Sequence, residues 1–451
     1  MTEQSGEPRD GDPLGNDVKM PDPVTVGRAM ADIAERSQRV VNGFLQRQSD
    51  GAGGASSIDP FNVGSAFFEM TAKMMSDPAM VMQAQLSLWK DHMALWQRTT
   101  QRLMGQEADP VIAPDRGDRR FKDAAWDENT LFDYIKQSYL LSARWMQSTV
   151  KEVNGLDDKT AKKVDFYTRQ FVDAMAPSNF VMTNPEVLRT TMESGGENLL
   201  KGLTNLLDDL ERGKGRLSIK MTDTEAFAVG ENIAVTPGRV VYQNDLMQLI
   251  QYTPTTEEVR KRPLLIIPPW INKYYILDLR PKNSFIAWAV GQGLTVFVIS
   301  WVNPDEKLAE KSFEDYMFEG PLAALDAITQ ATGETDANVI GYCLGGTLLT
   351  CTLSYMADKG DERFKSATFF TTMTDFSEAG ELSVFIDEEQ IAALESKMSE
   401  KGYLEATSMA TTFNMLRAND LIWSFVVNNY LLGKDPFPFD LLYWNSDSTR
   451  M

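Results

Sequence analysis

The spacing of the apolar residues changes once along the chain, near Gly213-Lys214-Gly215. Before this point apolar residues recur at about every third or fourth position, which predicts amphipathic helices. After it, short β-prone runs alternate with helical stretches, and such alternation predicts a parallel sheet covered on both faces by helices. The sequence therefore predicts an α/β fold with a parallel sheet, preceded by an all-helical N-terminal domain.

Breaks in the helical half come at turn and cap residues. Ser76-Asp77-Pro78 interrupts a Met-rich stretch over 61–105, because a cap residue before a proline restarts a helix. Residues 1–23, rich in Gly, Pro, Asp and Glu, predict a disordered tail, and the Gly/Ser-rich residues 51–57 predict a flexible linker. The remaining predicted helices of this half cover residues 24–48, 130–153, 159–175 and 185–212.

The second half is predicted to contain short strands and a cap. We expect strands at residues 217–221, 233–235, 240–242, 264–267, 295–299, 339–340 and 367–370, with helices at 284–291, 314–332 and 344–357. The stretches after Phe370 suit a cap insertion. The predicted organisation is a tail with one amphipathic helix and a linker (1–57), a helical domain (58–213), an α/β core (214–373) and a cap (374–451), and we expect the chain to end before the last sheet strands.

Charge and cysteine content limit the classes of function. Lys and Arg number 44 against 64 Asp and Glu, a net charge of −20, which repels phosphate backbones and argues against nucleic acid as a partner. The two cysteines, Cys343 and Cys351, exclude a disulfide scaffold and most cysteine metal sites and suit the cytoplasm. No apolar run approaches the roughly 20 residues of a transmembrane segment. We expect no metal and no transmembrane segment.

One motif carries chemistry. Residues 339–346 read Val-Ile-Gly-Tyr-Cys-Leu-Gly-Gly, an apolar run, a G-x-C-x-G turn and the start of a helix. A nucleophile in such an elbow adopts strained dihedral angles, and the positions two before and two after it must be small. Gly341 and Gly345 meet that requirement around Cys343, whose thiolate the helix N-terminus favours. The alternative is that Cys343 is a small core residue between glycines that only allow packing. We expect Cys351 to be a buried packing residue.

Two backbone N–H groups are candidates for an oxyanion hole. The N–H of Leu344 follows the nucleophile directly and would point at a reacting carbonyl. The strand at 264–267 ends in Pro268-Pro269-Trp270-Ile271, and an N–H near Trp270 or Ile271 is the second candidate. The alternative is that the two prolines simply terminate the strand.

Several motifs together resemble class I poly(3-hydroxyalkanoate) synthases. They are residues 268–279, 300–305, 341–346, 418–423 and 440–445, and the resemblance extends over about residues 60–451. It implies an α/β-hydrolase core that polymerises (R)-3-hydroxyacyl-CoA on Cys343 and releases coenzyme A. It also implies that the coenzyme A thioester is a substrate and that no cofactor is needed. The implied partners are the polyester granule surface, granule-coating proteins and a second copy in a homodimer.

The family's other catalytic groups have no match in this chain. Its members pair the cysteine with a downstream histidine, as base, and an aspartate, both on loops after later strands. The one histidine here is His92, which precedes the predicted sheet. We therefore expect that this polypeptide does not turn over hydroxyacyl-CoA. Two alternatives stay open, a cysteine-type thioesterase or esterase and a non-catalytic granule-binding partner of a complete synthase.

Two further groups have both a functional and a structural interpretation. The Met- and Trp-rich segment forms either an adaptable surface for a granule or partner or ordinary packing between helices; its members are Met70, Met74, Met75, Met80, Met82, Trp89, Met93 and Trp96. Asp278 either orients the loop after the prolines or pairs with Arg280. Lys273 and Arg280 either attract coenzyme A phosphates or form surface salt bridges.

Overall fold

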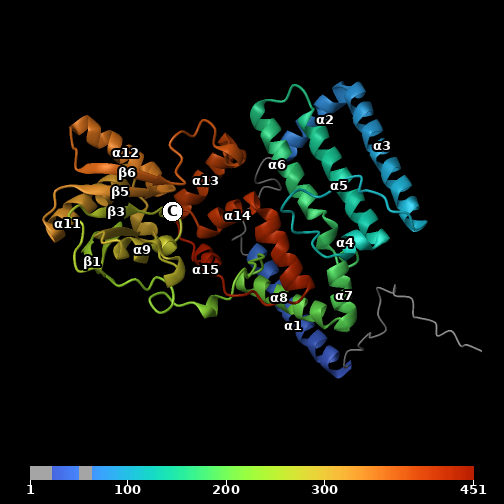
Figure 1. Ribbon diagram of the computed structural model, residues 1–451, viewed down its shortest axis with the longest axis horizontal. Coiled ribbons are helices and arrows are strands. Elements are labelled where there is room, and N and C mark those ends of the chain that lie inside the picture. The colour runs from blue at the N-terminus through green and yellow to red at the C-terminus, as the bar shows by residue number, and fades with distance from the viewer. Residues whose placement is uncertain (1–22, 50–62) are drawn as a thin grey trace, which may run out of the picture. The chain divides into compact units, whose positions relative to one another are not determined.

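A computed structural model describes residues 23–49 and 63–451 (Figure 1). The predicted linker 51–57 and all but the last residue of the predicted tail 1–23 lie outside the described residues. The chain divides into two compact units, each described here by itself. The helical unit comprises Met1–Lys220 and Arg417–Asp435, and the sheet unit comprises Met221–Leu416 and Pro436–Met451. No described helix is both long enough and apolar enough to cross a membrane.

The helical unit is built largely where the apolar spacing predicts helices. Its α-helices are α1 (Pro23–Ser49), α2 (Val63–Ser76), α3 (Pro78–Leu103), α4 (Ala125–Glu128), α5 (Thr130–Lys151), α6 (Asp158–Ala174), α7 (Pro185–Glu193) and α8 (Glu197–Arg212). The predicted break is present, since Asp77 Oδ1 accepts the Met80 N–H at 3.0 Å and caps α3. The single helix predicted over 185–212 is wrong, because Gly195 and Gly196 adopt left-handed dihedral angles and separate α7 from α8.

A late segment of the chain belongs to the helical unit. Arg417–Asp435, which the sequence groups with the cap, contains the π-helical turns η8 (Asn419–Trp423) and η9 (Val426–Leu431). The hydroxyl of Tyr430 donates to Asp209 of α8. A Cβ atom on Gly202 would lie 1.8 Å from the Tyr430 carbonyl oxygen, so only glycine allows η9 to approach α8 this closely.

The sheet unit contains a six-stranded mixed sheet in the order β1-β2-β4-β3-β5-β6. The strands are β1 (Gly238–Gln243), β2 (Met247–Tyr252), β3 (Leu264–Ile267), β4 (Val296–Trp301), β5 (Ala337–Tyr342) and β6 (Phe364–Phe370). The α-helices are α9 (Phe285–Gly291), α10 (Phe313–Met317), α11 (Ala323–Thr332), α12 (Leu344–Lys359), α13 (Glu388–Lys401), α14 (Ala406–Leu416) and α15 (Asp440–Ser446). Strands β3 to β6 are parallel, as predicted, whereas β2 runs antiparallel to both β1 and β4.

Two predicted strands are absent from the described sheet. The backbone of residues 217–221 is hydrogen-bonded to α8 and not to a strand. The N–H of Ser218 donates to the carbonyl of Asp209, and the N–H of Lys220 donates to the carboxylate of Asp209. In 233–235 Ile233 forms only an isolated bridge with Val229. Strand β2 was not predicted, because Gln248 and Gln251 interrupt its apolar residues without a strict alternation, and its place in the sheet depends on pairing with β4.

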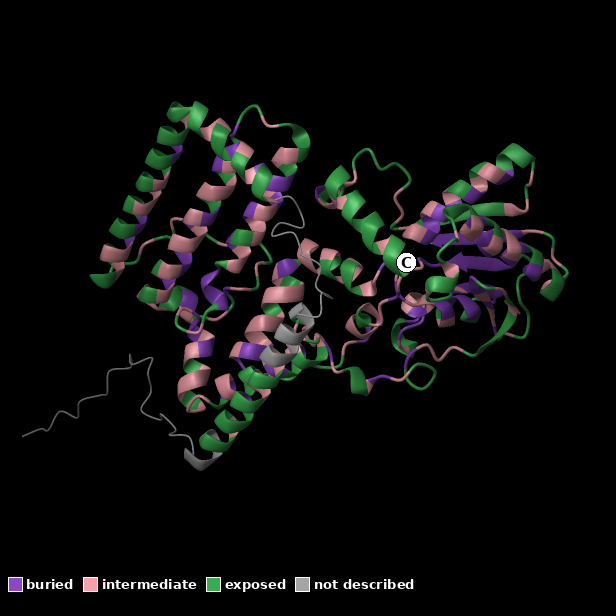
Figure 2. Cartoon of the chain, turned by 180° about the vertical axis from the view of Figure 1, so that it is seen from behind, coloured by how far each residue is buried: buried purple, intermediate pink, exposed green. Residues whose placement is uncertain are grey.

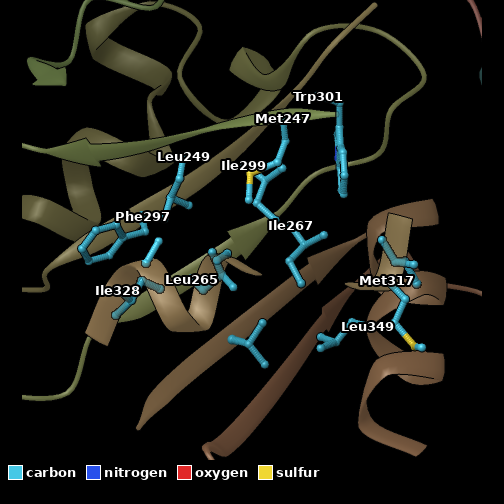
Figure 3. Packing of buried hydrophobic residues seen from close by; sticks show 14 residues of the cluster. Met247, Leu249, Leu265, Ile267, Phe297, Ile299, Trp301, Met317, Ile328 and Leu349 are labelled. Carbon is cyan, nitrogen blue, oxygen red and sulfur yellow. The ribbon is translucent and has the colours of Figure 1, made fainter. Parts of the chain in front are cut away.

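The core of the sheet unit lies on both faces of β3 and β4, the strands that Figure 2 colours as buried. Leu265 and Ile267 of β3 point to the face covered by α11 and α12, and the close view of Figure 3 shows them beside Phe297 and Leu349. Ile266, one position along, faces α9 instead. Each such side chain contributes about 1.5–3 kcal/mol of burial free energy. This rigid layer fixes the carboxyl ends of β3 and β5.

Candidate active site

Cys343 occupies a sharp turn between β5 and α12. Its dihedral angles are φ 52° and ψ −123°, a conformation that non-glycine residues rarely adopt and that costs about 1–3 kcal/mol. Its N–H donates to the carbonyl of Phe370 at 2.9 Å, and its carbonyl accepts the N–H of Gly346 at 2.9 Å. Bonds on both sides therefore hold the backbone in this conformation, and the side chain is half-buried.

The glycines beside Cys343 allow three backbone segments to meet. A Cβ atom on Gly345 would lie 2.1 Å from the carbonyl oxygen of Ile267, and one on Gly341 would lie 2.4 Å from the Cα of Gly346. Gly346 is constrained by a side chain, because a Cβ there would lie 2.0 Å from Thr372 Oγ1. All three contacts are too short for any side chain. The geometry is that of a strand–nucleophile–helix elbow.

Leu344 is the first residue of α12. The first N–H groups of a helix have no acceptor within the helix, and they carry the partial positive charge of its N-terminus. The N–H of Leu344 is thus free of an intrahelical bond and directly follows Cys343. Its function in an oxyanion hole stays a prediction.

The loop that contains Ile271 leaves the same edge of the sheet as Cys343. Strands β3 and β5 are parallel neighbours with Ile267 opposite Gly341. Thr449 fixes the loop on both sides of Ile271: its hydroxyl donates to the Trp270 carbonyl at 2.6 Å and accepts the N–H of Asn272 at 2.7 Å. The N–H of Ile271 as second oxyanion donor stays a prediction.

Aromatic side chains line this edge of the sheet. The ring of Trp270 lies 6.0 Å from that of Trp301, 6.0 Å from that of Phe313 and 5.1 Å from that of Tyr316. The indole N–H of Trp301 donates to the Pro268 carbonyl at 2.8 Å. The ends of β3 and β4 therefore meet in a largely apolar wall.

Asp278 and Arg280 have separate structural partners. Hydroxyl groups of Thr236 and Ser284 donate to Asp278 Oδ1 at 2.5 and 2.6 Å, and Asp278 is buried. Arg280 pairs instead with Asp440 at 2.8 Å. Burial tends to raise the pKa of Asp440, but hydrogen bonds from Arg280 and an asparagine outweigh it, so this pKa lies below its usual range. Asp278 thus anchors the loop, which is one of the two alternatives considered, and Arg280 pairs with Asp440 instead.

The remaining candidates belong to another unit or have another environment than predicted. His92 lies on α3 of the helical unit, whereas Cys343 belongs to the sheet unit. Cys351 is exposed on α12, so the expectation that it is buried is wrong. The described residues contain no group of three or more His, Cys, Asp or Glu side chains arranged to hold a metal ion.

Sequence reasoning missed three threonines that bond to these loops. Thr449 lies 177 positions from Asn272, and Thr372 lies in the segment that follows β6. Thr347 lies in the first turn of α12. Thr347 has a sequence signal, its position four residues after Cys343. Thr449 and Thr372 have none, because only the folded chain brings them to the site.

The sheet order, the elbow and the helices on both faces define the class of protein. A family model described as the alpha/beta hydrolase fold matches residues 282–450. The sheet unit is therefore an α/β-hydrolase fold whose elbow carries a cysteine, and a helical region precedes it.

A second family model, described as the N-terminus of poly-beta-hydroxybutyrate polymerase (PhaC), matches residues 117–289. The chain is 56% identical over 398 residues to a poly(3-hydroxyalkanoate) polymerase of Methylorubrum extorquens, covering 88% of this chain and 66% of that protein. It is 50% identical over 431 residues to the poly(3-hydroxyalkanoate) polymerase subunit PhaC of Rhizobium meliloti, covering 95% and 70%. The corresponding subunit of Cupriavidus necator is 42% identical over 379 residues, covering 83% and 62%.

The chain belongs to the poly(3-hydroxyalkanoate) polymerase family. It spans about two thirds of the length of these curated relatives.

Proposed function

We propose that the protein is an acyltransferase that polymerises (R)-3-hydroxyacyl-CoA through a thioester on Cys343. The observation that carries the proposal is the strained cysteine at the N-terminus of α12, in a chain whose relatives bear the name polymerase. In the first step the thiolate attacks the carbonyl carbon of the substrate, a new sulfur–carbon bond forms, and coenzyme A leaves as a thiolate that takes up a proton.

Elongation needs a second attack at the same carbonyl carbon. The hydroxyl of a second hydroxyacyl-CoA attacks the Cys343 thioester, an ester bond forms, and the cysteine leaves as a thiolate while the hydroxyl proton passes to a base. The lengthened chain, still a coenzyme A thioester, then acylates Cys343 again and releases coenzyme A. Each added monomer thus releases one coenzyme A, and the coenzyme is a substrate rather than a cofactor.

The N–H groups of Leu344 and Ile271 are proposed to stabilise the oxyanion of each tetrahedral intermediate. The first position of α12 and the parallel pairing of β3 with β5 support this assignment. The aromatic wall around Trp270 supports exclusion of water, which polymerisation requires if hydrolysis is to be avoided.

The proposal assigns no residue as the base. The single histidine of the sequence, His92, belongs to the helical unit. Incubating the chain with (R)-3-hydroxybutyryl-CoA and quantifying free coenzyme A by chromatography tests the acylation step. Elongation needs a base and none is assigned in this chain, so we expect acylation of Cys343 without further turnover. The expected result is at most one equivalent of coenzyme A per chain, no release from Cys343→Ala and unchanged release from Cys351→Ala. Release that persists in Cys343→Ala would refute the proposal. Many equivalents of free hydroxy acid would instead identify a thioesterase.

The Met- and Trp-rich segment divides into a packed and an exposed part. Met70, Met74 and Met80 pack in one apolar cluster with Val150 of α5 and Val164 of α6, as the structural interpretation predicts. The exposed face of α3, which Figure 2 shows in green, carries the other part. It consists of Met82, Leu86, Trp89, Met93, Trp96 and Leu103, and we name it the α3 face. Trp89 and Trp96 are 61% and 60% exposed.

We propose that the α3 face binds the polyester granule surface, and that the protein resides at that surface in the cytoplasm as a homodimer. An exposed apolar stripe of this length is unusual unless it has a partner. Purified granules should retain the Trp89→Gln/Trp96→Gln variant several-fold less well than the wild type. Trp288→Gln is the matched control, because Trp288 is 56% exposed on α9. Equal retention of all three proteins would contradict the assignment.

A further inference from the structure

The segment after β6 is hydrogen-bonded to the elbow at several points. The carbonyl of Phe370 accepts the Cys343 N–H at 2.9 Å. Thr372 Oγ1 lies 3.4 Å from the Gly341 carbonyl oxygen and 3.2 Å from that of Phe370. The hydroxyl of Thr347 donates to the carbonyl of Met373 at 2.8 Å. Hydrogen bonds thus link the segment 371–373 to β5, to the elbow and to the first turn of α12.

The bond made by Thr347 differs from those of the other hydroxyl residues on α12. Thr350, Thr352 and Ser354 each donate to the carbonyl four residues earlier in the same helix, at 2.8–3.0 Å. For Thr347 that carbonyl belongs to Cys343, which already accepts N–H groups from Gly346 and Thr347. The Thr347 hydroxyl instead reaches a neighbouring segment, so its bond links the helix to another part of the sheet unit.

The linked segments contain two strained residues. Cys343 has φ 52° and Thr371 has φ 46°, and neither is glycine. They directly follow Tyr342 and Phe370, which are partners in the β5–β6 register. Two adjacent conformations that each cost about 1–3 kcal/mol persist only where the surroundings hold them. The Thr347–Met373 bond is one of the few side-chain bonds available for this purpose.

We propose that Thr347 is a positioning residue for Cys343, which rests on the proposed acylation of that cysteine. Its hydroxyl holds the first turn of α12 against segment 371–373. It thereby keeps the sulfur of Cys343 and the N–H of Leu344 directed at the same carbonyl group. Without the hydroxyl, the first turn has more freedom and this alignment is lost, while the core beneath it is unchanged.

Thr347→Val tests this, with Thr350→Val as the matched control. Both threonines are half-buried on α12, but the Thr350 hydroxyl bonds only within its own helix. Two reactions are compared in each variant. Acylation by (R)-3-hydroxybutyryl-CoA needs both sulfur and oxyanion donor, whereas alkylation by iodoacetamide displaces iodide at a saturated carbon and needs no oxyanion hole. Exposed Cys351 serves as the internal reference for alkylation.

We expect Thr347→Val to slow acylation about tenfold, a loss of about 1.4 kcal/mol in transition-state stabilisation. Alkylation of Cys343 relative to Cys351 should fall about threefold, with an altered pH–rate profile. Thr347→Ser should restore both rates, and Thr350→Val should match the wild type.

Three results would overturn the assignment of Thr347. The first is equal behaviour of Thr347→Val and Thr350→Val. The second is a Thr347→Ser variant as slow as Thr347→Val. The third is an equal loss in acylation and alkylation accompanied by a lowered unfolding midpoint, which indicates only a structural function. If wild-type Cys343 is not acylated, the proposed function fails, and the alkylation comparison still decides whether Thr347 positions the thiol.

Discussion

Replacing Gly345 by alanine adds one methyl group where the elbow meets the backbone of β3. The new Cβ atom would lie 2.1 Å from the Ile267 carbonyl oxygen and 2.7 Å from that of Pro268. Ordinary contact begins at 3.4 Å, so the N-terminus of α12 must move by about 1.3 Å from β3. Both oxygens belong to the backbone of a buried strand and the turn that follows it, which cannot yield as a flexible side chain would.

The cost of this displacement follows from the two opposing effects of the methyl group. Overpacking of this kind costs about 3 kcal/mol, and the better helix propensity of alanine returns about 1 kcal/mol. We therefore expect the free energy of unfolding to fall by about 2 kcal/mol, which lowers the urea midpoint by about 1 M for a typical m-value of about 2 kcal/mol/M. Acylation of Cys343 should also become undetectable, because the Leu344 N–H moves with the helix.

Gly291→Ala is the control for this measurement. Gly291 is also helical, at the end of α9, and a Cβ there has no atom within 4 Å. This variant should be as stable as the wild type or up to about 1 kcal/mol more stable. Urea titration followed by circular dichroism compares the three proteins. A Gly345→Ala variant as stable as Gly291→Ala would refute the close approach of α12 to β3.

Two further variants test the surroundings of the site. Because the pKa of Asp440 is lowered in the folded state, its charge stabilises the fold above the unfolded-state value of about 3.9, and this stabilisation is lost as the pH falls through the folded-state pKa. The stability difference between wild type and Asp440→Asn in urea titrations should thus shrink below about pH 4, and a constant difference would contradict this. Thr449→Val removes the hydroxyl bridge around Ile271 and should slow acylation several-fold while leaving iodoacetamide alkylation of Cys343 unchanged. Thr329→Val, which loses only a bond within α11, should leave both rates unchanged.

The sequence predicted the parts of the fold that depend on local apolar patterns. The fully buried β3 was predicted with its observed limits, because a strand covered on both faces is a continuous apolar run. The cap at Asp77 and the glycines around Cys343 were also predicted, since each has a local chemical reason. Local patterns thus predicted both the elbow and the strand that supports it.

Features that depend on distant partners were not predictable in the same way. The antiparallel β2 has two glutamines that interrupt its apolar residues, and it becomes a strand by pairing with β4. Residues 217–221 look β-prone but bond to the end of α8. Thr449 and Thr372 reach the site only through the folded chain, so no spacing in the sequence indicates them.

The most direct measurement of the central claim is the position of the acyl group after brief reaction with (R)-3-hydroxybutyryl-CoA. Acid quenching, proteolysis and mass spectrometry locate the adduct, and hydroxylamine at neutral pH should remove it if it is a thioester. The account predicts one 3-hydroxybutyryl group on the peptide that contains Cys343 and none on a peptide that contains only Cys351. Coenzyme A release without an adduct on Cys343, or an adduct on Cys351 instead, would contradict it.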